Sequence, residues 1–330
     1  MSRNIKTILN QLQTSAKKDF GQHFLINKNK IDFITRELSH RKDTLIIEIG
    51  PGLGSITEKI LESSNNVLCI EKDKIFSQYL KDKFKNKKNF ILIEQDILRV
   101  NLNKIAKSKK AIVFGNLPYN IASQIIIKFV DELHDKGNIG IFMFQKEVAE
   151  RILSSCGSKS YNAFTLKIKS FFDVKKLLDL NESDFWPAPK IKSTLVKLAP
   201  KEIDRFILDE YIEFSRFLTN CFHIKRKTLM NNLQNLYLKK EILPILKKLE
   251  KKENVRAEEL KEEEFIKLFK YLKNYFKEHE YMPIFEEMKV YMNIKSKSGV
   301  YNMLGSIEWK GYIKKYPAHA RMIKIIKEVA

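Results

Sequence analysis

Apolar runs of strand length alternate with amphipathic stretches over the first 200 residues of the chain. The runs are rich in Ile, Val, Leu and Phe, and most stop at a glycine or a polar residue, as buried strands do. They span 45–49, 67–70, 90–93, 111–114, 140–144 and 194–198. The stretches between them repeat apolar residues at helical spacing, so the pattern predicts an α/β fold with a parallel sheet covered by helices.

The pattern changes after Pro200. Residues 205–272 contain no glycine and repeat apolar residues at helical spacing, which predicts a small helical domain. Further helices are predicted over 265–276, 284–292 and 297–309, followed by a short hairpin between 310 and 325. We therefore expect four parts: a polar arm (1–16), the α/β domain (17–200), the helical domain (201–272) and a C-terminal segment (263–330) that shares its first helix with the helical domain.

A glycine-rich turn follows the first predicted strand, where residues 48–54 run Glu-Ile-Gly-Pro-Gly-Leu-Gly. Gly50, Gly52 and Gly54 allow a tight turn and the close approach of a ligand. The spacing differs from the G-x-G-x-x-G of dinucleotide sites, and Pro51 separates the first two glycines. A hydride-transferring NAD enzyme is therefore disfavoured.

Acidic residues end the next two predicted strands. Glu71 lies about 20 residues beyond the glycine turn, where a carboxylate typically binds ribose hydroxyls. Asp96 follows the third strand. Because parallel strands bring their carboxyl ends to one edge, these groups should line one crevice, which suits a nucleoside without phosphates.

The tetrapeptide Asn116-Leu117-Pro118-Tyr119 ends the fourth predicted strand. Pro118 fixes its own φ and favours an extended Leu117. The Asn116 side-chain oxygen and the Leu117 carbonyl can then accept hydrogen bonds from one exocyclic amine, while Tyr119 stacks on the ring. Chemistry on a base amine requires such a site, because the base must leave its stack. The alternative is an ordinary strand-to-helix turn.

Several separate blocks of the chain are similar to those of one family. They cover 20–25, 48–54, 116–119, 145–151, 185–191, 225–233 and 255–260. On these blocks the chain, from about residue 17 to about residue 272, resembles the S-adenosylmethionine-dependent rRNA adenine N6,N6-dimethyltransferases of the KsgA type. Related antibiotic-resistance methylases share the glycine turn, but they usually carry Ile in place of Leu117 and lack the 145–151 block.

This resemblance implies a Rossmann-like methyltransferase domain, a cofactor and a set of site residues. The implied contacts to S-adenosylmethionine are His23, Leu25, Glu48, Gly50, Gly52, Gly54, Glu71, Asp96, Ile97 and Asn116, with His23 standing where the family often has Asn. The implied catalytic set is Asn116, Leu117, Pro118, Tyr119 and Phe185. Phe185 would stack on the base opposite Tyr119; core packing at a proline-rich turn is its alternative.

The C-terminal segment carries a second resemblance. Residues 281–283, 296–301 and 309–313 are similar to the winged helix-turn-helix of the LexA repressor's DNA-binding domain. The resemblance implies that the helix over 297–309 faces a major groove, with Lys297 and Tyr301 as contacts and Arg321 in the wing. No self-cleavage domain follows, so that repressor's switch is not implied. A helical cap and an RNA-contacting extension are the alternatives.

The charge of the chain fits a nucleic-acid partner. Lys and Arg number 61 against 40 Asp and Glu, which gives a net charge of +21 over 330 residues. Such a charge attracts phosphates and predicts salt-dependent binding, although lysines on ordinary solvated faces account for part of the excess. Lys225, Arg226 and Lys227, on a helical pattern, are the best candidates for specific phosphate contacts.

Other features narrow the class of protein. Cys69, Cys156 and Cys221 are too far apart for a metal or disulfide spacing, and the six His show no metal-binding pair. There is no apolar run of membrane-spanning length, and the first 20 residues are polar. We expect a cytoplasmic monomer without a metal and without a membrane partner.

We therefore expect an enzyme that methylates N6 of two adjacent adenines near the 3′ end of small-subunit (16S) rRNA during ribosome biogenesis, with the small subunit as partner. The residues support amine methylation, and the resemblance supplies the rRNA substrate. One alternative is a DNA adenine methylase directed by the C-terminal segment, since Asn-x-Pro-Tyr corners also serve DNA. Another is a ribosome-assembly or transcription regulator whose binding role dominates.

Overall fold

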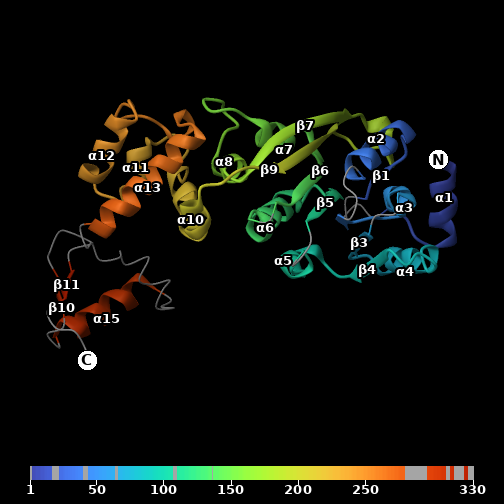
Figure 1. Ribbon diagram of the computed structural model, residues 1–330, viewed down its shortest axis with the longest axis horizontal. Coiled ribbons are helices and arrows are strands. Elements are labelled where there is room, and N and C mark those ends of the chain that lie inside the picture. Colours follow the sequence, from blue (N-terminus) through green and yellow to red (C-terminus); the bar gives the residue numbers. More distant parts are fainter. Residues whose placement is uncertain are drawn as a thin grey trace. The chain divides into compact units, whose positions relative to one another are not determined.

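The computed structural model describes residues 2–16, 22–39, 44–63, 66–106, 110–135, 137–278, 296–309, 313–315 and 323–325. By its internal contacts the chain divides into two units, Met1–Thr219 and Asn220–Ala330. Most elements of both are labelled in Figure 1.

Unit 1 is built on a seven-stranded sheet with the order β4-β3-β2-β5-β6-β9-β7 (Figure 1). Its parallel strands are β4 (Phe90–Glu94), β3 (Asn66–Glu71), β2 (Leu45–Ile49), β5 (Ala111–Asn116) and β6 (Ile139–Gln145). β9 (Ser193–Pro200) pairs antiparallel with β6, and β7 (Phe172–Leu180) pairs antiparallel with β9 at the edge of the sheet. The predicted α/β fold is confirmed, and the carboxyl ends of β2, β3, β4 and β5 meet at one edge.

Helices cover both faces of this sheet. Successive strand residues point to opposite faces, so Ile46 and Ile47 of β2 are both fully buried but belong to different layers. One layer consists of α2 (Lys28–Leu38), α3 (Ser55–Glu62) and α4 (Lys74–Lys83). In the other, α6 (Ala122–Leu133) packs Phe129 on Phe142 of β6 and contacts α5 (Leu102–Ile105) and α8 (Ala163–Lys169). α7 (Lys146–Leu153) follows β6 directly.

Polar residues just after the strands begin the next helices. The Asp73 carboxylate accepts from the Ile75 amide at 2.9 Å and caps α4. Asp96 accepts from the Leu98 amide at 3.0 Å and caps the 3₁₀ turn η2 (Ile97–Arg99). A cap satisfies an otherwise unpaired helix N–H, so each strand end is held at a defined turn.

The N-terminal segment differs from the expected polar arm. Residues Ser2–Gln11 form the helix α1, whose Ile5 and Leu9 are 6% and 2% exposed. They belong to a cluster with Phe24, Leu53 and Phe76. Apolar residues four positions apart give a mostly polar helix one apolar face, which is why composition alone suggested an arm.

Two short strands join distant parts of unit 1. β1 (Phe24–Leu25) pairs antiparallel with β8 (Phe185–Trp186). Beside them, the Asn27 amide group donates to Asp184 Oδ1 at 2.6 Å, and the Ile26 N–H donates to the Asp184 carbonyl at 2.8 Å. Asp184 ends the 3₁₀ turn η3 (Glu182–Asp184). The sequence pattern predicted neither strand.

Unit 1 extends beyond the boundary expected at residue 200, through α9 (Arg205–Asp209) and into α10 (Tyr211–Cys221). The Tyr211 ring stacks on His134 with centroids 4.0 Å apart, and its hydroxyl donates to Asp131. Lys167 pairs with the same carboxylate at 2.6 Å. These contacts fix the start of α10 to unit 1.

Unit 2 is helical up to residue 278, as predicted. It contains α11 (Leu229–Leu233), α12 (Lys239–Lys248), the 3₁₀ turn η4 (Ala257–Glu259) and α13 (Glu262–Glu278). The predicted helix over 297–309 is α15 (Lys297–Trp309), and the predicted hairpin pairs β10 (Ile313–Lys315) with β11 (Ile323–Ile325). The helix predicted over 284–292 lies outside the described residues. None of the described helices is long and apolar enough to cross a bilayer.

Candidate active site

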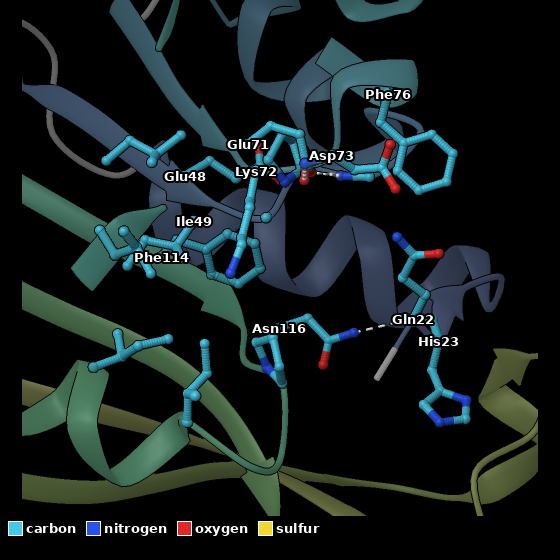
Figure 2. A pocket seen from close by; sticks show the side chains of 18 of the residues that line it. Gln22, His23, Glu48, Ile49, Glu71, Lys72, Asp73, Phe76, Phe114 and Asn116 are labelled. Atoms are coloured by element: carbon cyan, nitrogen blue, oxygen red, sulfur yellow. Dashed lines mark hydrogen bonds between the residues drawn. The ribbon is translucent and has the colours of Figure 1, made fainter. Parts of the chain in front are cut away.

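A cavity of about 270 Å³ lies at the carboxyl edge of the sheet (Figure 2). It gathers many of the residues predicted from the sequence. These are His23, Leu25, Glu48, Gly50, Gly52, Glu71, Asp96, Ile97, Asn116 and Pro118. Four of the parallel strands or the turns after them contribute, as expected where strand ends meet.

The glycine turn forms one wall of the cavity. Gly50, Gly52 and Gly54 have φ values of +66°, +57° and +74°, a region that side chains disfavour. A Cβ on Gly50 would enter open space, whereas one on Gly52 would lie 3.1 Å from the Phe24 ring. The first two glycines therefore bring bare backbone to the cavity.

Gly54 has a different role from the predicted cofactor contact. It is not among the residues that line the cavity. A Cβ there would lie 2.8 Å from Leu80 Cδ2 and 2.9 Å from Phe84 Cε2. The third glycine thus lets the start of α3 approach α4 closely, and the spacing alone could not separate this packing role from ligand contact.

Two carboxylates at strand ends present acceptors to the cavity. Glu71 accepts from the Asp73 amide at 2.9 Å and from the Gly52 amide at 3.3 Å, and burial raises its pKa. Asp96 is held by Lys72 at 2.8 Å, a hydrogen bond that lowers the pKa of Asp96. Each carboxylate oxygen can accept more than one hydrogen bond, so both groups retain capacity for a ligand.

Glu48 lies deeper than the other acids and is only 3% exposed. Its Oε2 accepts from the Thr57 hydroxyl at 2.6 Å and from the Cys69 thiol at 3.8 Å. Burial raises the pKa of Glu48 to about 7, with a smaller contribution from Glu71. The hydrogen bonds from Thr57 and Cys69 act in the opposite direction.

The Asn116 corner is held from two sides. The Asn116 side-chain NH₂ donates to the His23 carbonyl at 2.9 Å, which leaves the side-chain oxygen as the acceptor (Figure 2). The Leu117 N–H donates to the Met143 carbonyl of β6 at 3.3 Å, while the Leu117 side chain is 1% exposed. Leu117 and Tyr119 do not line the cavity itself.

His23 and Tyr119 form an aromatic pair beside this corner. Their ring centroids are 5.9 Å apart and their planes differ by 25°. His23 Nδ1 lies 2.7 Å from the Pro187 carbonyl, to which it donates. His23 thus joins the Asn116 corner to the proline-rich turn.

Phe185 is buried in the structure, and its contact with a base stays a prediction. Its side chain is 3% exposed and packs in the core cluster with Leu25, Leu180 and Leu195. It does not line the cavity. The alternative weighed from the sequence, core packing, is therefore the geometry observed, because β8 turns this ring inward when it pairs with β1.

Sequence reasoning missed several lining residues, three of which directly follow strand ends. They include Gln22, Lys72, Asp73, Phe76, Gln95, Phe114, Asn120 and Ile121. Lys72, Asp73 and Gln95 could have been found by counting one or two positions past Glu71 and Glu94. Phe76 could not, since its approach depends on how α4 packs.

The cavity is acidic although the chain is basic. Its lining contains four carboxylates, Glu48, Glu71, Asp73 and Asp96, against the single lysine Lys72. The chain as a whole carries +21. Such a lining favours a cationic ligand without phosphates. The described residues include no group of three or more His, Cys, Asp or Glu that could hold a metal ion.

None of the predicted nucleic-acid contacts is among the residues that line this cavity. Lys225, Arg226 and Lys227 are exposed in the turn between α10 and α11, and not in a helix as their pattern suggested. Lys297 begins α15, and Tyr301 on that helix is 57% exposed. Arg321 is outside the described residues.

The seven-stranded sheet, the glycine turn and the acidic cavity define a Rossmann-like methyltransferase. The chain belongs to the ribosomal RNA adenine dimethylase family, whose profile matches residues 13–274. The ribosomal RNA small subunit methyltransferase A of Borreliella burgdorferi is 38% identical over 274 residues, which are 82% of this chain and 94% of the relative. The protein of that name from a Sulfurihydrogenibium species is 37% identical over 78% of this chain and 96% of its own length.

Solved structures agree with this assignment. A dimethyladenosine transferase from Plasmodium falciparum superposes with a TM-score of 0.65 at 28% identity, covering 76% of this chain and 98% of its own. The 23S rRNA methyltransferase ErmE, at 19% identity and a TM-score of 0.60, supports the fold. The LexA DNA binding domain profile matches residues 264–322.

Proposed function

We propose that this protein transfers methyl groups from S-adenosylmethionine to N6 of two adjacent adenines near the 3′ end of small-subunit rRNA, giving N6,N6-dimethyladenosine. The observation that carries the proposal is the Asn116 corner, whose amide is turned by the His23 carbonyl so that an acceptor faces the cavity side. Family membership and the named relatives support the rRNA substrate. The place of action would then be the cytoplasm, where small subunits are assembled.

The charge of the cavity lining supports this cofactor. Glu71 would accept from the ribose hydroxyls, and Asp96 with Ile97 would hold the adenine ring by its amine and its face. The backbone at Gly50 and Gly52 leaves room for the amino-acid portion. When bound, S-adenosylmethionine supplies an electrophilic methyl group on a positively charged sulfur.

The Asn116 corner would orient the target amine. An adenine N6 lone pair is delocalised into the ring, so the amine is a weak nucleophile. Acceptance of its two hydrogens by Asn116 Oδ1 and the Leu117 carbonyl favours a more pyramidal nitrogen with its lone pair directed at the methyl group. The same acceptors stabilise the positive charge that develops on nitrogen. No general base is needed before attack, because the proton lost afterwards is acidic.

Tyr119 would stack on one face of the flipped base. With Phe185 buried, the ring placed to contribute the other face is His23, nearly parallel to Tyr119 at 5.9 Å. The two rings would have to move apart to admit a base, because two stacked spacings of roughly 3.4 Å exceed the 5.9 Å between their centroids. Aromatic stacking contributes roughly 1–3 kcal/mol per base, comparable to the cost of unstacking the target.

Methyl transfer from labelled S-adenosylmethionine tests this proposal. The full chain is supplied with unmethylated small subunits and, in parallel, with duplex DNA. We expect dimethyladenosine in the rRNA and no label in the DNA. Asn116→Ala should abolish transfer while rRNA binding persists, and Asn103→Ala, an exposed change on α5, is the matched control. Label on DNA alone would refute the rRNA assignment, and full activity of Asn116→Ala would refute the mechanism.

We also propose that the C-terminal segment binds nucleic acid through α15. The LexA-type match and the exposed Tyr301 support this. The double change Lys297→Ala and Tyr301→Ala in the full chain should weaken binding to duplex DNA without lowering transfer to small subunits. A loss of subunit binding instead would make the segment an rRNA-contacting extension.

A further inference from the structure

The helix α15 carries a tryptophan side chain that is almost wholly exposed. Trp309 is 86% exposed, which makes it the most exposed large apolar side chain in the described part of the chain. Tyr301, about two turns earlier on the same helix, is 57% exposed. Tryptophan side chains are highly buried on average, and exposed Trp and Tyr rings are typical of contact surfaces. The two rings therefore mark a surface of α15 that is available to a partner.

Both rings lie off the buried side of α15. Val300 and Leu304 are 0% and 3% exposed and define that side. Trp309 comes nine residues after Val300, which is two and a half helical turns, so it stands opposite the buried side. Gly305 lies four residues from each ring and has no side chain to fill the space between them. The helix thus presents two aromatic rings about 12 Å apart along its axis, at 1.5 Å per residue.

Positive charge accompanies these rings. The hairpin that follows α15 pairs β10 with β11 in a register that sets Lys314 directly opposite Lys324, and β10 contacts α15 (Figure 1). Like charges at directly opposite positions destabilise paired strands, and a bound polyanion offsets this cost. Residues 296–330 contain seven Lys and Arg against two Asp and Glu. The surface therefore fits a polyanion that can also stack on aromatic rings, which is the chemistry of a nucleic acid.

We propose that Trp309 and Tyr301 stack on unpaired bases, so that the C-terminal segment binds single-stranded nucleic acid in preference to duplex. This inference rests on the proposed nucleic-acid binding through α15, and it names the form of the ligand. In a duplex, neighbouring bases cover both faces of each internal base, so an aromatic ring reaches a base face only where a strand is unpaired. Duplex DNA can still contact the basic residues and the Tyr301 hydroxyl, but it gains no stacking from Trp309.

Tryptophan fluorescence of the full chain measures this contact where it occurs. The chain has two tryptophans, so Trp186→Phe leaves Trp309 as the only one. Short oligouridylate and oligothymidylate strands are titrated beside a duplex of the same length. Neither homopolymer contains adenine, so neither offers the methyltransferase site a target amine. A stacked base should quench the emission of Trp309, with a Kd at least about tenfold lower for the single strands than for the duplex.

Further substitutions in this single-tryptophan protein separate stacking from charge. Tyr301→Ala removes the second ring and should raise the Kd for single strands by about 5- to 150-fold, the range of one base–aromatic stack, with a smaller effect on the duplex. Lys314→Ala combined with Lys324→Ala should lower the slope of log Kd against log salt concentration by about 1 for each lost phosphate contact. Ile212→Ala, which removes a 61% exposed apolar side chain from α10, is the matched control and should change neither quantity.

The outcomes distinguish this inference from the proposed function. Quenching by either single strand supports the inference, and the tighter strand identifies RNA or DNA as the source of the unpaired bases. Unchanged emission with both single strands, a duplex that binds as tightly as they do, or an unchanged Kd in Tyr301→Ala would overturn the inference alone. Unchanged emission with all three ligands, together with unaltered duplex binding in the double variant Lys297→Ala and Tyr301→Ala, would overturn nucleic-acid binding through α15 and this inference with it.

Discussion

Two glycines of the turn, Gly50 and Gly54, should respond very differently to substitution by alanine, and Gly54→Ala tests this most directly. A Cβ at Gly54 would lie 2.8 Å from Leu80 Cδ2 and 2.9 Å from Phe84 Cε2, and both neighbours are buried in the core. The left-handed φ of +74° costs an L-residue about 1–2 kcal/mol, and overpacking typically adds about 1–3 kcal/mol. We expect Gly54→Ala to lower the free energy of unfolding by about 2–5 kcal/mol.

Gly50→Ala is the matched comparison, because Gly50 has a similar φ of +66° and open space where the Cβ would go. Its cost should be the conformational part alone, about 1–2 kcal/mol. Gly50→Ala should weaken cofactor binding more than Gly54→Ala does, since Gly50 lines the cavity and Gly54 does not. Urea denaturation measures the first quantity and calorimetric titration of S-adenosylmethionine the second. Equal destabilisation by the two changes, or loss of binding in folded Gly54→Ala, would refute the division of roles.

Three further predictions concern stability, the N-terminal helix and the basic cluster. Glu48 has a pKa of about 7 in the fold against 4.5 for the ordinary side chain, so its contribution to stability is present below pH 4.5 and is lost as pH rises toward 7. Glu48→Gln should therefore raise the free energy of unfolding at pH 8 by up to about 3 kcal/mol and change it little at pH 4.5. An equal gain in the free energy of unfolding at both pH values would contradict this. Leu9→Ala should cost about 2 kcal/mol or more and weaken cofactor binding, because α1 packs against Phe24, Leu53 and Phe76, which line the cavity. The exposed control Asn10→Ala should do neither, and unchanged binding in Leu9→Ala would show that the cavity does not need this support. The double variant Lys225→Ala and Lys227→Ala should lower the slope of log Kd for rRNA against log salt concentration by about 1 for each lost phosphate contact. The control Lys248→Ala, on α12, should leave this slope unchanged. An unaltered slope in the double variant would mean that other residues make the phosphate contacts.

The central part of the fold could be predicted from sequence because burial on both faces makes a strand apolar throughout. β2, β3 and β5 are of this kind, and the site residues at their ends followed from the meeting of carboxyl ends at one edge. β7 was missed, since it lies at the edge of the sheet and its half-exposed surface carries Lys175, Lys176 and Asp179. A two-residue strand such as β1 has no periodicity to detect.

The direction in which individual side chains point was harder to predict from the sequence than the strands were. The sequence identified Phe185 as an aromatic residue at a proline-rich turn, but the pairing of Phe185 with Leu25 decides that its ring points into the core. The same pairing brings His23 beside Tyr119. Gly54 is similar, because its role depends on the distance to Leu80 on another helix. Such features arise from contacts between residues that are distant in the chain, so local sequence patterns do not predict them.

The pairing of β1 with β8 also sets an order of assembly for unit 1. The hydrogen bond from Asn27 to Asp184 spans 157 residues and that from His23 to Pro187 spans 164. In an unfolded chain, closing a loop of this length would cost roughly 4–5 kcal/mol of chain entropy, which two-residue strands cannot offset, so the sheet between them must fold first. We expect the wall that carries His23 to form last as the chain leaves the ribosome and to open first in the folded protein, so that hydrogen exchange releases the Ile26 amide before those of β2. The protein would thus acquire its cavity only after β8 has been synthesised, which keeps an incomplete nascent chain from holding the cofactor.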